Sequence, residues 1–201
     1  MKESKEVSLS PELVSNLIRS RRSVFVNQFV PGKKIPDNII YEILENANWA
    51  PTHKKTEPWR FMVFTGPGLQ KLATFQSDMY KKNAGGKFKE DKFRKLATTP
   101  LDCSHVISIS MKRSLEANIP EVEEIAAVAC AVQNIYLSVT AYGLGGYWTT
   151  GGVTYMKEAK PFFHLEEDDR LMGFFYLGYV QIPPVRSTRG PIEEKTVWVS
   201  E

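Results

Sequence analysis

The sequence predicts an α+β fold, because stretches with helical periodicity and stretches typical of strands follow one another along the chain. Apolar residues recur at helical spacing after Ser10 and after Pro36, and a long, almost wholly apolar helix is expected before Gly143. Short runs of branched and aromatic residues indicate strands. The 201 residues contain no repeat and no linker, so we expect one domain, 1–201, that can bury about two-thirds of its unfolded surface.

The first two helices have clear ends. Ser10 can cap a helix whose first position is Pro11, and the apolar face that follows leads into 21–23. A second helix is expected to begin near 36–37 and to end at 50–51, where a proline stops it.

Strands are expected at 60–65, 106–111, 147–149 and 171–180, which are short and rich in branched and aromatic residues. The glycines and proline at 66–68 indicate a turn after the first of them.

The long helix is expected from about Pro120 to Gly143, where glycine can adopt the left-handed conformation that ends helices. Its faces are nearly all apolar or small, so a sheet with other helices, or a second subunit, must cover most of them. Polar groups that lipid could not satisfy interrupt it at Gln133, Asn134, Ser138 and Thr140. Because the N-terminus also lacks an apolar signal, we expect a cytoplasmic protein with no membrane partner.

Basic and acidic residues nearly balance, at 26 and 23, giving a net charge of +3. The Lys and Arg are spread over many segments, so no nucleic-acid partner is expected. The densest basic stretch, 81–95, also holds two acidic residues and the pair Gly85–Gly86. It is interpreted as a solvated loop or exposed helix, with a binding patch as the alternative.

The two cysteines, Cys103 and Cys130, stand far apart and away from any histidine cluster. This argues against zinc ligation and a redox dithiol, so we expect no metal site and two buried, reduced thiols.

The ends of the chain are expected to differ from the rest. Residues 1–9 should be flexible, and 190–201 should form an extended tail in which Trp198 needs a hydrophobic dock.

Side-chain catalytic machinery is not indicated. The chain has no GxGxxG, P-loop or GxSxG motif, and its histidines are scattered at His53, His105 and His164. The last two are interpreted as structural, whereas His53 is weighed equally as a ligand and as a structural residue. The chemistry is therefore expected to belong to a bound cofactor.

Three clusters could hold such a cofactor. Residues 21–23 offer two guanidinium groups and a hydroxyl suited to phosphate or carbonyl oxygens, although arginines at a helix end can also serve the helix dipole. Residues 50–59 form a polar loop fixed by two prolines. Residues 143–152 are rich in glycine, which allows the backbone to approach a flat ligand.

In this order and spacing, the clusters resemble the flavin-dependent nitroreductase family, from about Leu13 to the C-terminal tail. The resemblance rests on 21–23, on 50–59, on 143–146 and on 175–179. It implies a nitroreductase-like three-layer sandwich, in which helices flank a central, mainly antiparallel sheet and the chain dimerises through long helices. One FMN is expected in each of two pockets at the subunit interface.

The resemblance also assigns residues to the cofactor within one chain. The phosphate, ribityl chain and pyrimidine edge of FMN would be held by Arg21, Arg22 and Ser23. The flavin ring would lie along Trp148, Thr149 and Thr150.

Further assignments concern the loop and the tail. Thr52 and His53 resemble residues that reach the FMN of the other subunit. Arg189, in a segment that resembles a late family motif, would bind phosphate, with Arg186 in reserve.

Two positions depart from the family pattern. Many members have a further arginine where this chain has Phe25, and some place an arginine where it has Trp49. Phosphate binding is therefore expected to depend more on Arg21 and Arg189.

The expected function is an FMN-dependent oxidoreductase that passes electrons from NADH or NADPH, through flavin N5, to a small electron-poor acceptor of nitroaromatic, quinone or enone type. Donor and acceptor would share one slot, which predicts a ping-pong mechanism without a catalytic side chain. The alternative is a flavin-binding sensor or storage protein without efficient turnover.

Overall fold

The computed structural model describes residues 10–201, so the expected flexibility of 1–9 lies outside the described residues. Its centre is a sheet with strand order β1-β2-β4-β3, in which all three pairings are antiparallel. The strands are β1 (Trp59–Thr65), β2 (His105–Met111), β3 (Leu144–Thr149) and β4 (Arg170–Tyr179). The predicted α+β class is therefore confirmed.

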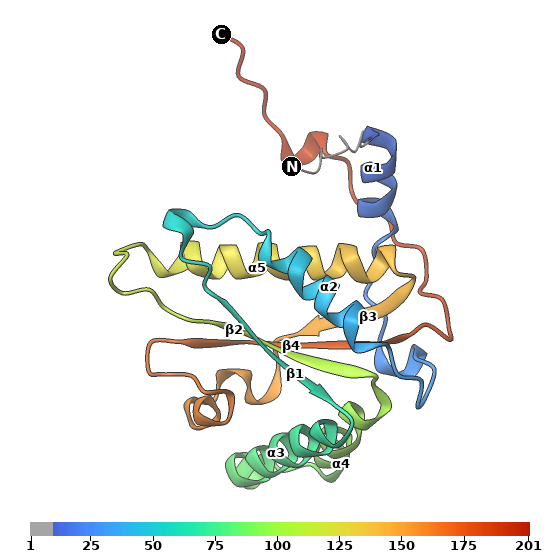
Figure 1. The fold of residues 1–201 in the computed structure, drawn as a ribbon, viewed down its shortest axis with the longest axis vertical. Coiled ribbons are helices and arrows are strands. Elements are labelled where there is room, and N and C mark those ends of the chain that lie inside the picture. The colour runs from blue at the N-terminus through green and yellow to red at the C-terminus, as the bar shows by residue number, and fades with distance from the viewer. Residues whose placement is uncertain (1–9) are drawn as a thin grey trace, which may run out of the picture.

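Helices cover both faces of the sheet, which gives the three layers that the family resemblance implied (Figure 1). One face carries α2 (Asp37–Asn48) and α5 (Glu121–Ala141), and the other carries α3 (Pro67–Ala84) and α4 (Glu90–Thr98). Alternation along β2 sends Ile107 and Ile109 into the α2–α5 core, and Val106 into the other. Because both faces are covered, the intervening Ser108 is buried as well.

The turn expected at 66–68 is also the start of α3, which the sequence did not predict. Gly66 adopts φ 51° as the helix N-cap, and Pro67 takes the first helical position. The basic stretch 81–95 comprises the end of α3, a short 3-10 turn and most of α4. Of the two structural interpretations of this stretch, an exposed helix therefore agrees better with the structure than a solvated loop does.

Helix α5 occupies the position expected for a buried helix. It is long and apolar enough to cross a membrane, but half of its most apolar window is buried inside the protein. Its outward face exposes Val122 and, further along, the small or polar side chains of Ala126, Ala129, Cys130 and Gln133. The prediction that Cys130 is buried was wrong, because its position on the helix faces away from the sheet, whereas Cys103 is buried as expected.

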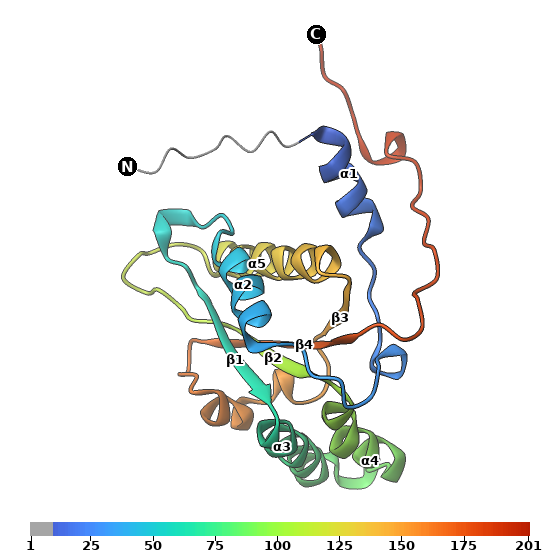
Figure 2. The same cartoon turned by 45° about the vertical axis from the view of Figure 1, so that its right-hand side comes forward.

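Two segments project from the three-layer body (Figures 1 and 2). Helix α1 (Pro11–Ser20) buries none of its residues, and Ile18 on it is 51% exposed. In the tail, which is extended around a 3-10 turn, Trp198 is 90% exposed. The expected dock for Trp198 is absent from residues 10–201 of this chain.

Gly178 of β4 shows why glycine is required in the 175–179 segment. A Cβ at this position would lie 2.5 Å from Cγ of Phe29, whose side chain is only 2% exposed. Phe29 also forms a bridge to Val180 and so ties the segment after α1 to the sheet. Because Phe29 is buried, its ring has no free space into which it could move away from a Cβ at position 178.

We predict that Gly178→Ala lowers the free energy of unfolding by about 1–3 kcal/mol, because overpacking forces Phe29 from its site. Denaturant unfolding followed by circular dichroism measures this change. The matched control is Gly86→Ala, where a Cβ would meet nothing within 4 Å. The control should change stability by no more than about 0.5 kcal/mol. Equal effects of the two substitutions would contradict the packing argument.

Candidate functional site

Tyr136, on α5, connects two of the predicted clusters. Its hydroxyl accepts a hydrogen bond from the backbone N–H of Trp148 (2.7 Å) and lies 3.3 Å from Oγ of Ser23. Its ring packs edge-on against Phe175 of β4, with centroids 4.7 Å apart. The guanidinium carbon of Arg21 lies 4.9 Å from the ring centre. Tyr136 was not among the site residues predicted from the sequence, although a single tyrosine in an otherwise apolar helix is a signal that could have identified it.

The segment that follows α1 runs along the edge of the sheet. The backbone N–H of Val24 donates to the carbonyl of Gly146 in β3 at 3.0 Å, which fixes 21–25 beside that strand. A Cβ on Gly146 would lie 2.5 Å from the ring of Phe175, and one on Gly145 would touch Val24 at 3.0 Å. These two glycines therefore let β3 pack closely against Val24 and Phe175. The expectation that they make room for a ligand was wrong for Gly145 and Gly146.

Arg21 and Arg22 differ in what they contact. Nη1 of Arg22 donates to the carbonyls of Arg19 (2.7 Å) and Arg21 (2.8 Å), so this side chain caps the end of α1. These contacts are those of the alternative interpretation, in which Arg22 serves the end of the helix. Within residues 10–201, neither arginine forms an ion pair with a carboxylate. Arg21, which lies over Tyr136, is left as the better anion ligand.

A cavity of about 500 Å³ lies beneath the end of β3, on the α3–α4 side of the sheet. Its aromatic wall is a row of rings, with centroids 5.0 Å apart from Phe25 to Tyr147 and 5.2 Å apart from Tyr147 to Tyr176. Burial raises the pKa of Tyr147 to about 12, so this wall is uncharged at neutral pH. The remaining lining includes Gln76, Lys92, Lys95, Thr99, Thr149, Gly151 and Gly152. Unlike Gly145 and Gly146, the glycines at 151 and 152 have no atom near a notional Cβ.

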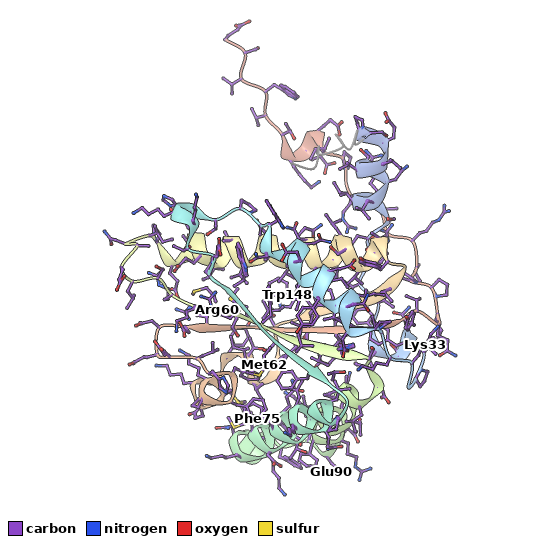
Figure 3. All side chains as sticks on the ribbon, viewed as in Figure 1. Lys33, Arg60, Met62, Phe75, Glu90 and Trp148 are labelled. Atoms are coloured by element: carbon purple, nitrogen blue, oxygen red, sulfur yellow. The ribbon has the colours of Figure 1, made fainter. Side chains whose placement is uncertain are left out.

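A second cavity, of about 420 Å³, lies near the same strand end and is lined by residues from both faces of the sheet, such as Leu171 on the α3–α4 side and Met172 on the α5 side. Trp148 and Thr150 line it, together with Arg170, which is ion-paired with Glu121. Trp148 lies between the sheet and α5 (Figure 3), and its indole N–H donates to the carbonyl of Met172 at 2.9 Å. Thr149, the last residue of β3, lines the first cavity, and Thr150, which follows the strand, lines the second.

Thr52 and His53 lie in a strained loop between α2 and β1. Lys54, Lys55 and Glu57 adopt φ of 51°, 56° and 44°, a region that side chains other than glycine rarely enter. The loop is fixed by Thr52, whose Oγ1 accepts from the N–H of Glu57 at 3.2 Å. Nδ1 of His53 lies 2.5 Å from a carboxylate oxygen of Glu123, in the first turn of α5.

The structure does not bring all the predicted residues together. Glu123, which holds His53, and Tyr136, which contacts Ser23, are 13 positions apart on α5, or about 20 Å along a helix axis. Nη1 of Arg189 contacts only its neighbours in the tail, Ser187 Oγ (2.5 Å) and the carbonyl of Thr188 (2.9 Å). Within one chain, therefore, 21–23 and β3 form one group, while 52–53 and Arg189 stand apart.

The structural role expected for His105 is confirmed. His105 is fully buried between Oγ of Ser104 (2.8 Å) and the carboxylate of Asp37 (3.1 Å). Trp59 is 5% exposed, and its indole N–H donates to Oδ1 of Asn48 at 2.9 Å. Trp49, at the position where some family members place an arginine, is 78% exposed.

Comparisons with known proteins agree with this arrangement. A family model described as "Nitroreductase family" matches residues 18–179. A Bacillus subtilis protein named "Putative NAD(P)H nitroreductase YfhC" is 28% identical over 185 residues, covering 91% of this chain and 92% of the relative.

Solved structures share the fold. A nitroreductase-like family protein from Bacillus cereus superposes with a TM-score of 0.76 at 27% identity, covering 98% of this chain and 99% of that one. The FMN-dependent nitroreductase NfnB from Mycobacterium smegmatis, solved in complex with NADPH, gives a TM-score of 0.71 at 18% identity, with coverage of 94% and 99%. With the family model matching most of its length, this chain belongs to the nitroreductase family.

Proposed function

We propose that this protein is an FMN-dependent oxidoreductase that passes electrons from NADH or NADPH to a small electron-poor acceptor. Membership of the family supports the class of reaction, and relatives named as NAD(P)H nitroreductases support the electron donor. The observation that carries the proposal is the group formed by Arg21, Ser23 and β3 around Tyr136, on the α5 side of an edge strand whose other face borders a cavity with an aromatic wall.

The residues of this group fit the chemistry of FMN. Arg21 and Ser23 supply a guanidinium and a hydroxyl, which suit a terminal phosphate. The cavity beneath Thr149 offers a neutral aromatic surface, and Gly151 and Gly152 leave backbone amides accessible at its edge. FMN is favoured over FAD, because no Rossmann fingerprint is present for an adenosine half.

FMN, when bound, supplies hydride transfer at N5, so no general acid or base is required of the protein. The contribution of this chain is to bind, orient and polarise. Positive charge at Arg21, with Lys92 and Lys95 at the cavity, favours a ligand that gains negative charge on reduction. Donor and acceptor then use the same slot in turn, and the acceptor is a nitroaromatic, quinone or enone.

We further propose a cytoplasmic homodimer of single-domain subunits, with Thr52 and His53 of each chain serving the FMN of the other. The separation of about 20 Å along α5 supports this, because His53 is too far from the Ser23 group of its own chain. The uncharged outward face of α5 between Ala126 and Gln133 is suited to close packing against a second copy. Helix α1 and the tail, with Ile18 and Trp198 exposed, likewise require a cover.

In this dimer, Arg189 reaches a phosphate only after its tail has docked. The interface is of obligate size, on the order of 2,000 Å² or more.

The function is tested by the released flavin and by kinetics. We expect purified or reconstituted protein to release FMN and not FAD, as chromatography of the denatured sample shows. With NADH or NADPH and a quinone or nitroaromatic acceptor, initial-rate plots at several acceptor concentrations should be parallel, because both substrates use one slot.

Release of predominantly FAD, or failure of the protein to take up any flavin, would contradict the proposed function. Intersecting plots would replace the shared slot by a ternary complex. Bound FMN without oxidation of either nicotinamide cofactor would identify a sensor or storage protein.

We predict that Tyr136→Phe weakens FMN binding by about five- to twentyfold, because Ser23 and the N–H of Trp148 lose a shared hydrogen-bond partner. Flavin fluorescence titration of the apoprotein measures the affinity. Tyr41→Phe is the control, since Tyr41 is 76% exposed on α2. An unchanged affinity in Tyr136→Phe would remove Tyr136 from the site.

The shared site is tested with a mixed dimer of Arg21→Ala and His53→Ala. Each parental homodimer has two damaged pockets, whereas the mixed dimer concentrates both lesions in one pocket and leaves the other intact. It should therefore recover up to about half of wild-type FMN content and activity, if each substitution costs the ~1.5–3 kcal/mol of a charged hydrogen bond. Co-expression with two different tags isolates the mixed species.

Two results would count against this arrangement. A mixed dimer no better than the mean of its parents would place both residues on one flavin, or leave His53 without a flavin role. A monomeric wild-type protein in sizing experiments would overturn the shared site.

A further inference from the structure

The net positive charge of this chain is concentrated in the basic stretch 81–95. The stretch contains seven Lys and Arg residues and two Asp and Glu residues, whereas the whole chain has an excess of only three basic residues. Arg94 pairs with Glu90, but none of the lysines of the stretch forms an ion pair with a carboxylate in the described part of the chain, 10–201. Their charges are therefore available to an anion.

Three of these lysines surround one cavity. It has a volume of about 340 Å³ and lies where α3 turns into α4, two helices that lie side by side on one face of the sheet (Figures 1 and 2). The lysines are Lys87, Lys89 and Lys92, and the remaining lining is Tyr80, Asn83, Ala84 and Met156. Like charges repel one another, so three ammonium groups around one concave surface favour the binding of a negatively charged ligand.

Tyr80 positions these lysines. Its side chain is buried, and its hydroxyl accepts a hydrogen bond from the backbone N–H of Lys89 at 2.9 Å. The same hydroxyl donates to the carbonyl of Lys87 at 3.4 Å. Nζ of Lys92 lies 4.8 Å from the centre of the Tyr80 ring, which attracts the ammonium group by a cation–π interaction. One buried tyrosine thus fixes the backbone at two of the lysines and holds the side chain of the third.

The lysine cavity is a neighbour of the cavity beneath β3. Lys92 lines both of them, and Met156 lines both the lysine cavity and the one that contains Trp148. A ligand that reacts beside β3 can therefore extend past Lys92 to the turn between α3 and α4. A volume of about 340 Å³ is at the lower end for small-molecule sites. It suits one end of a dinucleotide and not the whole molecule.

The two electron donors of the proposed reaction differ in charge at the end remote from the nicotinamide ring. NADPH carries a 2′-phosphate on its adenosine, whereas NADH has a hydroxyl there. A phosphomonoester carries a charge of about −1.5 to −2 at neutral pH and offers three acceptor oxygens, and a lysine ammonium group is a donor only. Three lysines without acidic partners are complementary to this group.

We propose that Lys87, Lys89 and Lys92 bind the adenosine 2′-phosphate of NADPH, so that this protein selects NADPH over NADH as its electron donor. The inference rests on the proposed function and deepens it by naming the donor. Lys87 and Lys89 determine specificity without taking part in the chemistry, because neither lines the cavity beneath β3.

The first test compares the two donors. We expect wild-type protein to have a kcat/KM for NADPH at least about tenfold above that for NADH, the effect of one charged hydrogen bond. Lys87→Gln combined with Lys89→Gln removes two of the three charges. The kcat/KM of this double variant should fall about tenfold with NADPH, through KM, and by no more than about twofold with NADH, which lacks the 2′-phosphate.

The matched control is Lys71→Gln combined with Lys82→Gln, which removes the same charge at two exposed positions of α3 that do not line the lysine cavity. It should keep the wild-type preference for NADPH.

A second readout requires no turnover. In calorimetric titrations of the FMN-loaded protein at low salt, adenosine 2′,5′-bisphosphate should bind about tenfold more tightly than 5′-AMP, which lacks the 2′-phosphate. The Lys87→Gln, Lys89→Gln variant should lose this difference. The titration of wild-type protein decides the point even if the variant does not fold.

Four results would overturn the inference. Wild-type protein that uses NADH at least as efficiently as NADPH does so and leaves the proposed function intact. An equal loss in the control variant assigns the effect to net charge. Equal affinity for adenosine 2′,5′-bisphosphate and 5′-AMP removes the 2′-phosphate from the site, and inorganic phosphate that binds as tightly as the bisphosphate identifies a site for free phosphate. By contrast, oxidation of neither donor contradicts the proposed function itself.

Discussion

The burial of one face of α5 against the sheet is the constraint on which the rest of the structure depends. Val128, Val132 and Ile135 contribute that face to the main hydrophobic core, shared with β2, β4 and α2. Because α5 packs against the sheet along its length, each of its turns places its side chains at a fixed position relative to the strands. Its first turn anchors Arg170 through Glu121 and His53 through Glu123, and its C-terminal third places Tyr136 against β3.

The N-terminal end of α5 combines two kinds of interaction. The helix dipole favours acidic residues in the first turn. One of them, Glu124, is buried, with 1% of its surface exposed. Glu124 is ion-paired with Arg113 and accepts the backbone N–H of Ser114 at 3.0 Å. A buried carboxylate with two such partners holds the 111–120 connection in register with the helix. The strained loop that carries His53 is therefore supported by a rigid helix end.

The parts of the fold that the sequence predicted are those with local signals. Ser10 and Pro11 mark α1, and apolar periodicity with terminal prolines or glycines marks α2 and α5. Helix α3 was not predicted because its N-cap Gly66 and its first residue Pro67 are also turn residues, and because its buried face includes Gln76 and Ser77. Nothing local to a sequence says that a polar side chain will be covered by a sheet from elsewhere in the chain.

The candidate site could be predicted only in part, for a similar reason. The order of the motifs indicated 21–23 and 148–150, because these residue types have chemistry of their own. The hydroxyl of Tyr136 contacts Ser23, which is more than a hundred positions away in the sequence, and Trp148, which is about a dozen positions away. The glycines were recognised as places of close approach, but whether a ligand or Phe175 fills the space depends on the tertiary fold.

Two cavities adjoin the chain where β3 ends. Thr149 belongs to one and Thr150 to the other, so consecutive codons specify the walls of two different chambers. Both cavities use β4 and the 3-10 helix 152–155, but α3 and α4 contribute only to the first, and residues 156–160 with α5 only to the second. Substitutions in the unshared walls can therefore reshape one chamber while its neighbour keeps its form, which gives this scaffold a route to new small-molecule preferences at one cavity alone.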